Sequence, residues 1–267
     1  MQVGGRPALV CRALEPFARH LVTTRAWQLG LPAPDSSAAW DEVAAAVEAP
    51  LVRVHQVHGA EVLVHRAGDR REIAPDQTRA DVIVTNDPSR AIAIQTADCV
   101  PILIVDRRTG AVAAAHAGWR GLAASVPRVA VDALAREMGS RPEELIASAG
   151  PSIGACCYEV GEDVRAKFVE AGWKTAMTQR WFFEAPQPTS GNPSMPRVRG
   201  VEPGRWYFDS AAAARDQLES AGVPRDQIFV AGLCTASHAG VFCSYRRDGA
   251  PAGRMAAAIR SGPPHRP

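Results

Sequence analysis

The hydrophobic pattern of this chain predicts mainly strands in its first half and alternating helices and strands in its second half. Trp40, Val43 and Val47 recur at helical spacing, which predicts a short amphipathic helix over residues 38–47. Residues 51–58 alternate between two faces, as the side chains of a strand do. Other short apolar runs predict strands at 61–65, 81–85, 91–95 and 228–233.

Two further apolar runs form the most informative unit of the pattern. Residues 100–105 and 111–115 have the composition of buried strands. They are separated by the five residues 106–110, Asp-Arg-Arg-Thr-Gly, which are polar and end in glycine. A connection of this length between two strands predicts a β-hairpin.

The register of this hairpin would bring a cysteine and a histidine together. If the chain turns between Arg107 and Arg108, Cys99 lies directly opposite His116, with their β-carbons about 5 Å apart. A bulged turn that ends at Gly110 would shift the pairing by a residue or two and still keep both side chains within reach.

Helical patterns follow the hairpin. One helix is expected over about 121–138, although Pro127 must kink it or delay its start. Two more are expected over 162–171 and 211–221. Strands followed by alternating helices and strands predict an α+β fold: a single domain over residues 1–267, with a mixed β-sheet flanked by helices.

Residues 179–204 interrupt this pattern. They are rich in proline, glycine and serine and show no periodicity. We interpret the segment as a surface insertion within the domain rather than a boundary between domains, and expect it to be mobile or peripheral.

Composition and charge narrow the choice of compartment and partner. Apolar residues make up 46% of the chain, enough for a substantial core, and the net charge of +2 predicts no strong attraction to nucleic acid or anionic membrane. No stretch in residues 1–20 has the length of a signal peptide, and no later run reaches transmembrane length, so a cytoplasmic protein is expected.

The cysteines then suggest metal binding or nucleophilic chemistry rather than disulfides. The chain has six of them with no C-x-x-C pair, and disulfides are not expected in a reducing compartment. They are Cys11, Cys99, Cys156, Cys157, Cys234 and Cys243.

Cys99 and His116 would present a thiolate and an imidazole at one point, which suits the borderline-soft zinc ion. His58, at the end of its expected strand, is the best candidate for a third ligand. Two histidines and one cysteine leave a tetrahedral ion one open position, as in catalytic zinc sites, where a bound water becomes more acidic. The alternative is that Cys99 is a small buried apolar residue and both histidines are core residues with satisfied hydrogen bonds.

Two other segments could hold an anion. Residues 117–121, Ala-Gly-Trp-Arg-Gly, lead from a strand into a helix, whose first backbone N–H groups could bind an anion with help from Arg120. Residues 244–249 carry the pair Arg246 and Arg247, which could clamp a phosphate. The alternatives are a turn that needs glycine only for its geometry, and a pair of solvated surface arginines.

Seven motifs taken together resemble the YfiH-like laccase-domain family, in the family's order and over residues 51–260. They are residues 55–59, 80–85, 95–101, 116–121, 150–161, 234–235 and 244–249. The chain departs from the family at 24–28, which lacks an Arg-Gly-Gly turn, at Ala214 in place of an asparagine, and at Cys243 in place of an aromatic residue.

The resemblance implies a mixed α/β fold, a zinc site at His58, Cys99 and His116, and chemistry on purine nucleosides. The implied reaction is phosphorolysis of adenosine, inosine, guanosine and methylthioadenosine, with possible deamination of adenosine. The partners would be a purine nucleoside and phosphate. Arg25, Arg120 and Arg246 are then the candidates for binding phosphate, and Asp98 is the candidate acid for deamination.

Other functions stay open from the sequence. Cys99 and His116 could act as a nucleophile pair in a metal-free hydrolase. Bacterial relatives of the family are also described as polyphenol oxidases and peptidoglycan editing factors, so a role in cell-wall quality control is a further alternative. A multicopper oxidase is excluded, because the seven histidines are scattered and form no H-x-H cluster. The oligomeric state stays open, with a monomer favoured.

Overall fold

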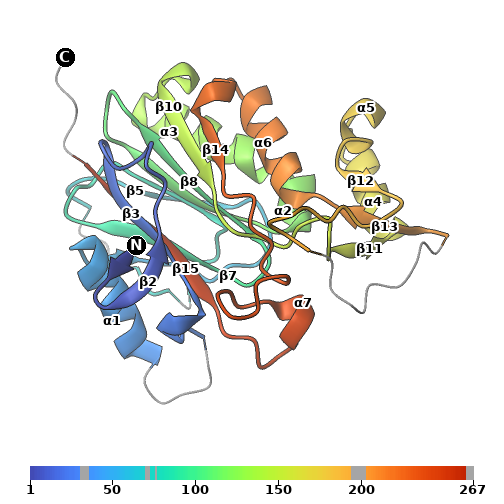
Figure 1. Cartoon of the computed structure of the whole chain (residues 1–267). Helices are drawn as coiled ribbons and strands as arrows, with labels where there is room; N and C mark the ends of the chain where they lie inside the picture. Colours follow the sequence, from blue (N-terminus) through green and yellow to red (C-terminus); the bar gives the residue numbers. More distant parts are fainter. Residues whose placement is uncertain (31–35, 70–72, 76, 194–202, 263–267) are drawn as a thin grey trace.

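Two β-sheets stacked face to face form the centre of the molecule (Figure 1). The computed structural model describes residues 1–30, 36–69, 73–75, 77–193 and 203–262. Within these residues the strands form two six-stranded sheets and one three-stranded sheet. The expected α+β class and single domain are confirmed, although the strands form several mixed sheets rather than one.

The first six-stranded sheet joins strands from both ends of the chain. Its order is β1 (Gln2–Val3), β2 (Arg6–Leu9), β3 (Ala18–Thr23), β15 (Met255–Ser261), β7 (Ala91–Thr96) and β4 (Leu51–Val52). Strand β15 pairs antiparallel with β3 on one side and β7 on the other. The last strand of the chain therefore lies in the middle of this sheet.

The second six-stranded sheet contains the predicted hairpin. Its order is β14 (Ile228–Val230), β10 (Leu145–Ala149), β8 (Val100–Asp106), β9 (Val112–Ala117), β6 (Val82–Thr85) and β5 (Val62–His65). All residues of β6, β8 and β9 are buried. Because both faces of the sheet are covered, these strands appear in the sequence as continuous apolar runs.

Successive side chains along a strand point into different apolar layers, one between the two large sheets and one on the outer face of each. Ile92 of β7 and Leu103 of β8 belong to one apolar cluster, which lies between the two large sheets. Their neighbours Ala93 and Ile102 belong to two different clusters, on the outer faces. Helix α1 (Ser36–Val47) covers the outer face of the first sheet, and helices α2 (Trp119–Ala123), α3 (Val126–Met138) and α6 (Ser210–Ser220) cover that of the second.

The expected helix over 121–138 is two helices. Ser125, between α2 and α3, has a left-handed backbone with φ 62°, which no α-helix interior adopts. Pro127 is the second residue of α3, where a helix tolerates proline because its N–H would have no intrahelical partner. The interpretation that Pro127 delays the start of the helix is confirmed.

A three-stranded sheet on one side of the molecule holds part of the predicted insertion (Figure 1). Its strands are β11 (Glu159–Gly161), β13 (Arg205–Phe208) and β12 (Phe182–Phe183), and helices α4 (Glu162–Glu170) and α5 (Thr175–Thr178) accompany it. Trp181 and Phe182 are buried, so the interpretation of 179–204 as a surface insertion is wrong for these two residues. Residues 194–202 of that segment lie outside the described residues.

The expected strand over 51–58 ends at Val52. Beyond Val52, side chains rather than a neighbouring strand bond to the backbone. Gln56 bonds to the backbone of Gln95 in both directions, donating from Nε2 at 2.8 Å and accepting at Oε1 at 2.7 Å. The carboxylate of Asp81 accepts the backbone N–H groups of residues 57–59. The backbone groups are satisfied without a ladder, so the alternating pattern continues in a segment that is not a strand.

The remaining elements are short. They are the 3₁₀ turns η1 (Arg25–Trp27), η2 (Pro142–Glu144) and η3 (Arg225–Gln227), and helix α7 (Tyr245–Asp248). Strand β14 stops at Val230, three residues before the predicted end at residue 233. None of the helices in the described residues is both long and apolar enough to cross a membrane.

Candidate functional site

The β8–β9 hairpin has the shifted register. Pro101, not Cys99, lies opposite His116, so direct pairing of Cys99 with His116 is wrong and the bulged alternative is confirmed. The turn is longer because the carboxylate of Asp106 accepts the backbone N–H groups of Arg108 and Thr109. Gly110, with φ 74°, then returns the chain to β9.

The shift still brings the three predicted ligands together. One ligand atom each of His58, Cys99 and His116 lies within 4.8 Å of the others. The two imidazole rings meet edge to face, with centroids 4.7 Å apart. A β-carbon on Gly118 would lie 3.0 Å from Cys99 Sγ and 3.0 Å from His58 Cδ2, so glycine leaves room for the cluster. His58 is exposed, which argues against the alternative that all three are core residues.

Asp81 organises this cluster from behind and was not singled out by the sequence patterns. Its Oδ1 lies 2.8 Å from His116 Nδ1 and accepts the backbone N–H of His58 at 3.0 Å. Its Oδ2 accepts the N–H of Gly59 at 2.7 Å and that of Val57 at 3.2 Å. Burial works against its charged form, but the hydrogen bonds from His116 and Gly59 hold the pKa of Asp81 below its ordinary value. One carboxylate therefore fixes the His58 backbone, at φ 61°, and the His116 ring.

Cys99 and His116 shift each other's pKa. Burial favours the neutral thiol, yet hydrogen bonds from His116 and His58 lower the pKa of Cys99 to about 6. Burial likewise favours neutral imidazole, yet hydrogen bonds to Asp81 and Cys99 raise the pKa of His116 to about 9. Both pKa shifts favour the charged forms, a thiolate on Cys99 and an imidazolium on His116.

The donor set fits a zinc ion better than a copper cluster. His116 gives Nδ1 to Asp81 and keeps Nε2 for an ion, which is the usual arrangement of metal-bound histidine. One sulfur and two imidazole nitrogens match the ligands of catalytic zinc. Among the described residues, this is the one potential metal-binding group that contains histidine, too few imidazoles for a multicopper centre.

The cluster forms part of the wall of a pocket of about 460 Å³, within the range of small-molecule sites. Asp98, Arg120 and Arg246 line the same pocket, as the sequence predicted. Five lining residues were not singled out from sequence; they are Gln56, Gln95, Trp119, Tyr158 and Tyr245. All five stand within matched motifs, which is the signal that could have identified them.

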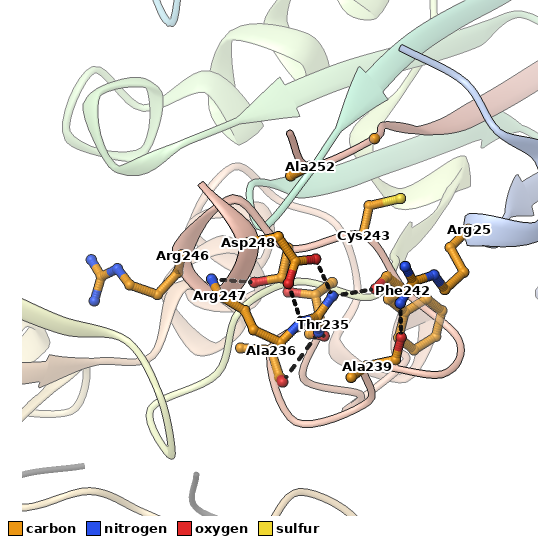
Figure 2. A network of polar contacts seen from close by, with 12 residues as sticks. Arg25, Thr235, Ala236, Ala239, Phe242, Cys243, Arg246, Arg247, Asp248 and Ala252 are labelled. Atoms are coloured by element: carbon orange, nitrogen blue, oxygen red, sulfur yellow. Dashed lines mark hydrogen bonds and ion pairs between the residues drawn. The ribbon is translucent and has the colours of Figure 1, made fainter. Parts of the chain in front are cut away.

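The neighbouring arginines Arg246 and Arg247 have different roles. Arg247 bonds to the backbone carbonyls of Thr235 and Phe242, at 3.0 and 2.9 Å, and pairs with Asp248 at 2.7 Å, so it fastens the loop to α7 (Figure 2). Arg246 points away from this network and is exposed.

The Arg246 guanidinium lies over the Tyr158 ring, 5.0 Å from its centroid, and donates to the Glu159 carbonyl at 2.6 Å. Arg120 lies over the Trp119 ring in a similar way, at 4.2 Å. Each arginine is thus held against an aromatic face in the pocket.

Arg25 is not brought into the pocket. It lies in a separate hollow with Cys243 and Asp248, and its guanidinium donates to the Ala239 carbonyl (Figure 2). The structure therefore gives no geometric support for Arg25 as a phosphate ligand beside Arg246.

Asp98 serves as an acceptor in this structure. Its Oδ1 accepts the Thr235 hydroxyl at 2.6 Å, and its Oδ2 accepts the backbone N–H of Arg246 at 2.7 Å. Its backbone is left-handed, with φ 88°. A non-glycine residue in this conformation is strained, and the two hydrogen bonds hold it there. Asp98 thereby positions both the neighbouring Cys99 and the first turn of α7.

Several known proteins share this sequence pattern. A purine nucleoside phosphorylase of Deinococcus radiodurans is 38% identical over 207 residues, 78% of this chain and 68% of that protein. A purine nucleoside phosphorylase of Bacteroides thetaiotaomicron is 36% identical over 181 residues, 67% of this chain and 60% of that protein. The chain thus matches less than two thirds of the length of the Bacteroides protein.

Solved structures extend the similarity to nearly the whole chain. The YfiH hypothetical protein of Bacillus licheniformis has a TM-score of 0.81 at 25% identity, covering 97% of this chain and 98% of that one. YlmD of Geobacillus stearothermophilus has a TM-score of 0.79 at 29% identity, covering 98% of each. The family described as multi-copper polyphenol oxidoreductase laccase matches residues 35–261. The chain belongs to this YfiH-type, laccase-like family.

Proposed function

We propose that the protein is a zinc-dependent, cytoplasmic purine nucleoside phosphorylase that cleaves adenosine, inosine, guanosine and methylthioadenosine with phosphate. One observation carries the proposal: the His58–Cys99–His116 cluster and the guanidinium groups of Arg120 and Arg246 line one pocket. The pocket therefore offers a metal-binding wall, cations for a phosphate and aromatic faces for a base. Its relatives in Deinococcus and Bacteroides bear the name purine nucleoside phosphorylase.

The reaction needs an oriented phosphate and a stabilised leaving group. A phosphate oxygen forms a bond to the anomeric carbon of the ribose while the bond from that carbon to the purine nitrogen breaks, and its electron pair passes to the purine, which takes up a proton. Arg246 and Arg120 would bind the phosphate, and Arg254 adds a third cation to the same pocket. Tyr158 and Trp119 would stack against the purine. Such positioning lowers the entropic part of the barrier.

His58, Cys99 and His116 would hold the zinc ion. When bound, zinc supplies Lewis-acid catalysis and lowers the pKa of bound water. Asp81 keeps His116 Nε2 and the His58 backbone in position for it.

Deamination of adenosine would need an acid beside the metal. Asp98 lines the pocket, but both of its carboxylate oxygens accept hydrogen bonds from Thr235 and Arg246. A proton donor would have to give up one of these bonds. We therefore propose phosphorolysis as the main activity and deamination as a secondary one.

The test is the release of free hypoxanthine from inosine by the zinc-loaded protein, with and without phosphate. We expect base and ribose 1-phosphate in equal amounts, only when phosphate is present, and a loss of activity in Cys99→Ala. Cleavage that is independent of phosphate, or unchanged in Cys99→Ala, would contradict the proposal. Ammonia release from adenosine measures the secondary activity in the same samples.

A metal-free hydrolase is the second candidate, because Asp81, His116 and Cys99 stand in the order of a carboxylate–imidazole–thiolate triad. Such an enzyme would suit a role in cell-wall editing. It predicts that chelators leave the activity intact, and that alkylation of Cys99 abolishes it. The phosphorylase predicts the opposite response to chelators.

A further inference from the structure

Three cysteines form a second cluster, separate from the site described above. Cys156 and Cys157 come from the loop after β10, and Cys234 comes from the segment after β14. All three are buried, and their sulfur atoms lie within 4.8 Å of one another. A parallel β-bridge between Ser152 and Cys234 holds the two segments side by side.

Two polar groups contact the sulfurs of this cluster. The backbone N–H of Gly154 donates to Cys234 Sγ at 3.3 Å. The Ser237 hydroxyl donates to the Pro193 carbonyl at 2.7 Å and lies 3.5 Å from Cys156 Sγ and 3.3 Å from Cys157 Sγ. The Gly154 N–H stabilises negative charge on Cys234 Sγ, as donors to metal-bound sulfur do. The single Ser237 proton goes to Pro193, so the Ser237 oxygen accepts from the thiols of Cys156 and Cys157.

A path from solvent reaches the cluster. Cys156 and Cys234 line a pocket of about 310 Å³, which also includes Arg215 and Asn192. Asn192 fixes the Cys234 backbone, since its Oδ1 accepts the Cys234 N–H at 2.5 Å. The pocket therefore borders two of the three cysteines.

We propose that Cys156, Cys157 and Cys234 bind one soft, thiophilic ion of the copper(I) class. Three sulfurs at about 2.3 Å from a central ion would stand about 4 Å apart, and the observed sulfurs, all within 4.8 Å of one another, are close to this spacing. Within the described residues, no imidazole or carboxylate joins this group as a fourth ligand. An all-sulfur, three-coordinate set selects monovalent copper, whereas the mixed set at His58 suits zinc.

Binding of the ion releases protons and involves no redox step. Each thiol that ligates the ion releases its proton to solvent, and no electron is transferred. The ion would then join two segments that also shape the first pocket. Tyr158 follows Cys157 directly, and Thr235 follows Cys234 and donates to Asp98. The inference goes beyond the proposed reaction and does not depend on it.

The alternative is that the three cysteines are small apolar core residues. They do contact Ile153 and Ala236 in an apolar cluster. Core packing alone would leave them indifferent to replacement by residues of similar size and would give no affinity for a thiophilic ion.

The experiment measures copper(I) binding in the Cys99→Ala chain, which lacks the other metal site. Copper(I) is added without oxygen, a copper(I) chelator competes for it, and bound metal is counted by elemental analysis. We expect one ion per chain, with only sulfur in its first shell by X-ray absorption. Cys234→Ser in the same background should lose the ion, and the matched control Cys11→Ser should retain it.

Zinc is added in a parallel arm. We expect the Cys99→Ala chain to lose zinc to a chelator under conditions where it retains copper(I). The proposal would be overturned if the chain holds zinc but not copper(I), or if X-ray absorption finds nitrogen in the first shell. It would also be overturned if the Cys99→Ala chain binds no ion, or if folded Cys234→Ser retains one. If Cys99→Ala does not fold, the wild-type chain should bind one copper ion more than Cys234→Ser. Equal stoichiometry would then refute the site. Neither result depends on phosphorylase activity.

Discussion

At the residue scale, one buried carboxylate explains the arrangement of the candidate metal site. Asp81 has no exposed surface and accepts hydrogen bonds from the His58, Gly59 and Val57 backbones as well as from the His116 ring. An acceptor with two oxygens can satisfy this many donors only when it is ionised. Replacement by an amide would direct a donor at other donors.

We therefore expect Asp81→Asn to weaken zinc binding about 10–100-fold, as the loss of a group that orients metal ligands usually does. A purely structural role would lower the free energy of unfolding and leave the zinc affinity of the folded protein unchanged. Competition with a zinc chelator, measured beside chemical denaturation, separates the two effects. Asp132→Asn, on the exposed face of α3, is the matched control and should change neither.

The position of Arg246 leads to a second prediction, on phosphate binding. Its guanidinium contacts Tyr158 and the Glu159 carbonyl at the edge of the pocket. Arg246→Lys keeps the charge but loses the planar fork that binds two phosphate oxygens. We expect the KM for phosphate to rise about ten- to hundredfold, corresponding to about 1.5–3 kcal/mol, with a smaller change in the KM for inosine.

The control for Arg246 is Arg225→Lys, because Arg225 pairs with Glu219 on the surface outside the pocket. Initial rates at varied phosphate and fixed inosine, then the reverse, give both constants. An unchanged phosphate KM in folded Arg246→Lys would remove this residue from the phosphate site.

At the element scale, the sequence predicted the strands of the central hairpin, but not the register in which they pair. The hairpin of β8 and β9 is visible because apolar residues fill both strands and a polar segment separates them. Its register was off by two residues, because the Asp106 side chain stabilises a longer turn than strand pattern alone indicates. The three candidate ligands His58, Cys99 and His116 could be named from the motifs. Asp81 stands in the matched motif 80–85 but was not singled out, since its role depends on contacts between distant segments.

The segment after α5 shows how composition misleads. Turn-forming residues suggested a surface excursion, but Trp181 is fully buried, donates from Nε1 to Asp216 at 2.9 Å, and contacts the Phe168 and Trp173 rings. The segment therefore contributes two neighbouring aromatic residues, Trp181 and Phe182, to the core. Two adjacent buried aromatic residues give no periodicity from which they could be recognised.

We expect Trp181→Ala to lower the free energy of unfolding by about 3–5 kcal/mol, as usual for truncation of a large buried aromatic residue. Glu184→Ala, at an exposed position three residues later, should change it by less than about 0.5 kcal/mol. Urea denaturation of the two variants and the wild type decides the point. Equal effects would mean that the segment is peripheral after all.

At the scale of the whole molecule, the two six-stranded sheets share one internal layer, and the ends of the chain meet in one of them. Strand β3, from the N-terminal part, pairs with β15, from the C-terminal part. This pairing joins residues more than two hundred positions apart and is invisible to local patterns. The stability of the sheet therefore depends on groups such as His20 of β3, which lies opposite Ile259.

His20 makes global stability depend on pH. It is 6% exposed, its Nε2 accepts the Cys11 N–H at 2.8 Å, and its Nδ1 lies 3.1 Å from the Ala18 carbonyl. These two contacts fit the neutral ring with a proton on Nδ1. Burial is the largest influence and lowers the pKa of His20 from its ordinary value of 6.5, although the hydrogen bond to Ala18 acts in the opposite direction.

The sign of the effect follows from proton linkage. Below about pH 6.5 the unfolded chain takes up a proton at His20 that the folded chain does not, so the free energy of unfolding falls as the pH falls. The slope from this residue cannot exceed about 1.4 kcal/mol per pH unit.

His20→Asn removes the titrating group, so the wild type should lose more stability than the variant between about pH 7.5 and 5.5. Denaturation by urea across this range measures both slopes, with His55→Asn, an exposed histidine, as control. Parallel curves for the wild type and His20→Asn would show that His20 stays equally protonated in the folded and unfolded chains, and would contradict the prediction.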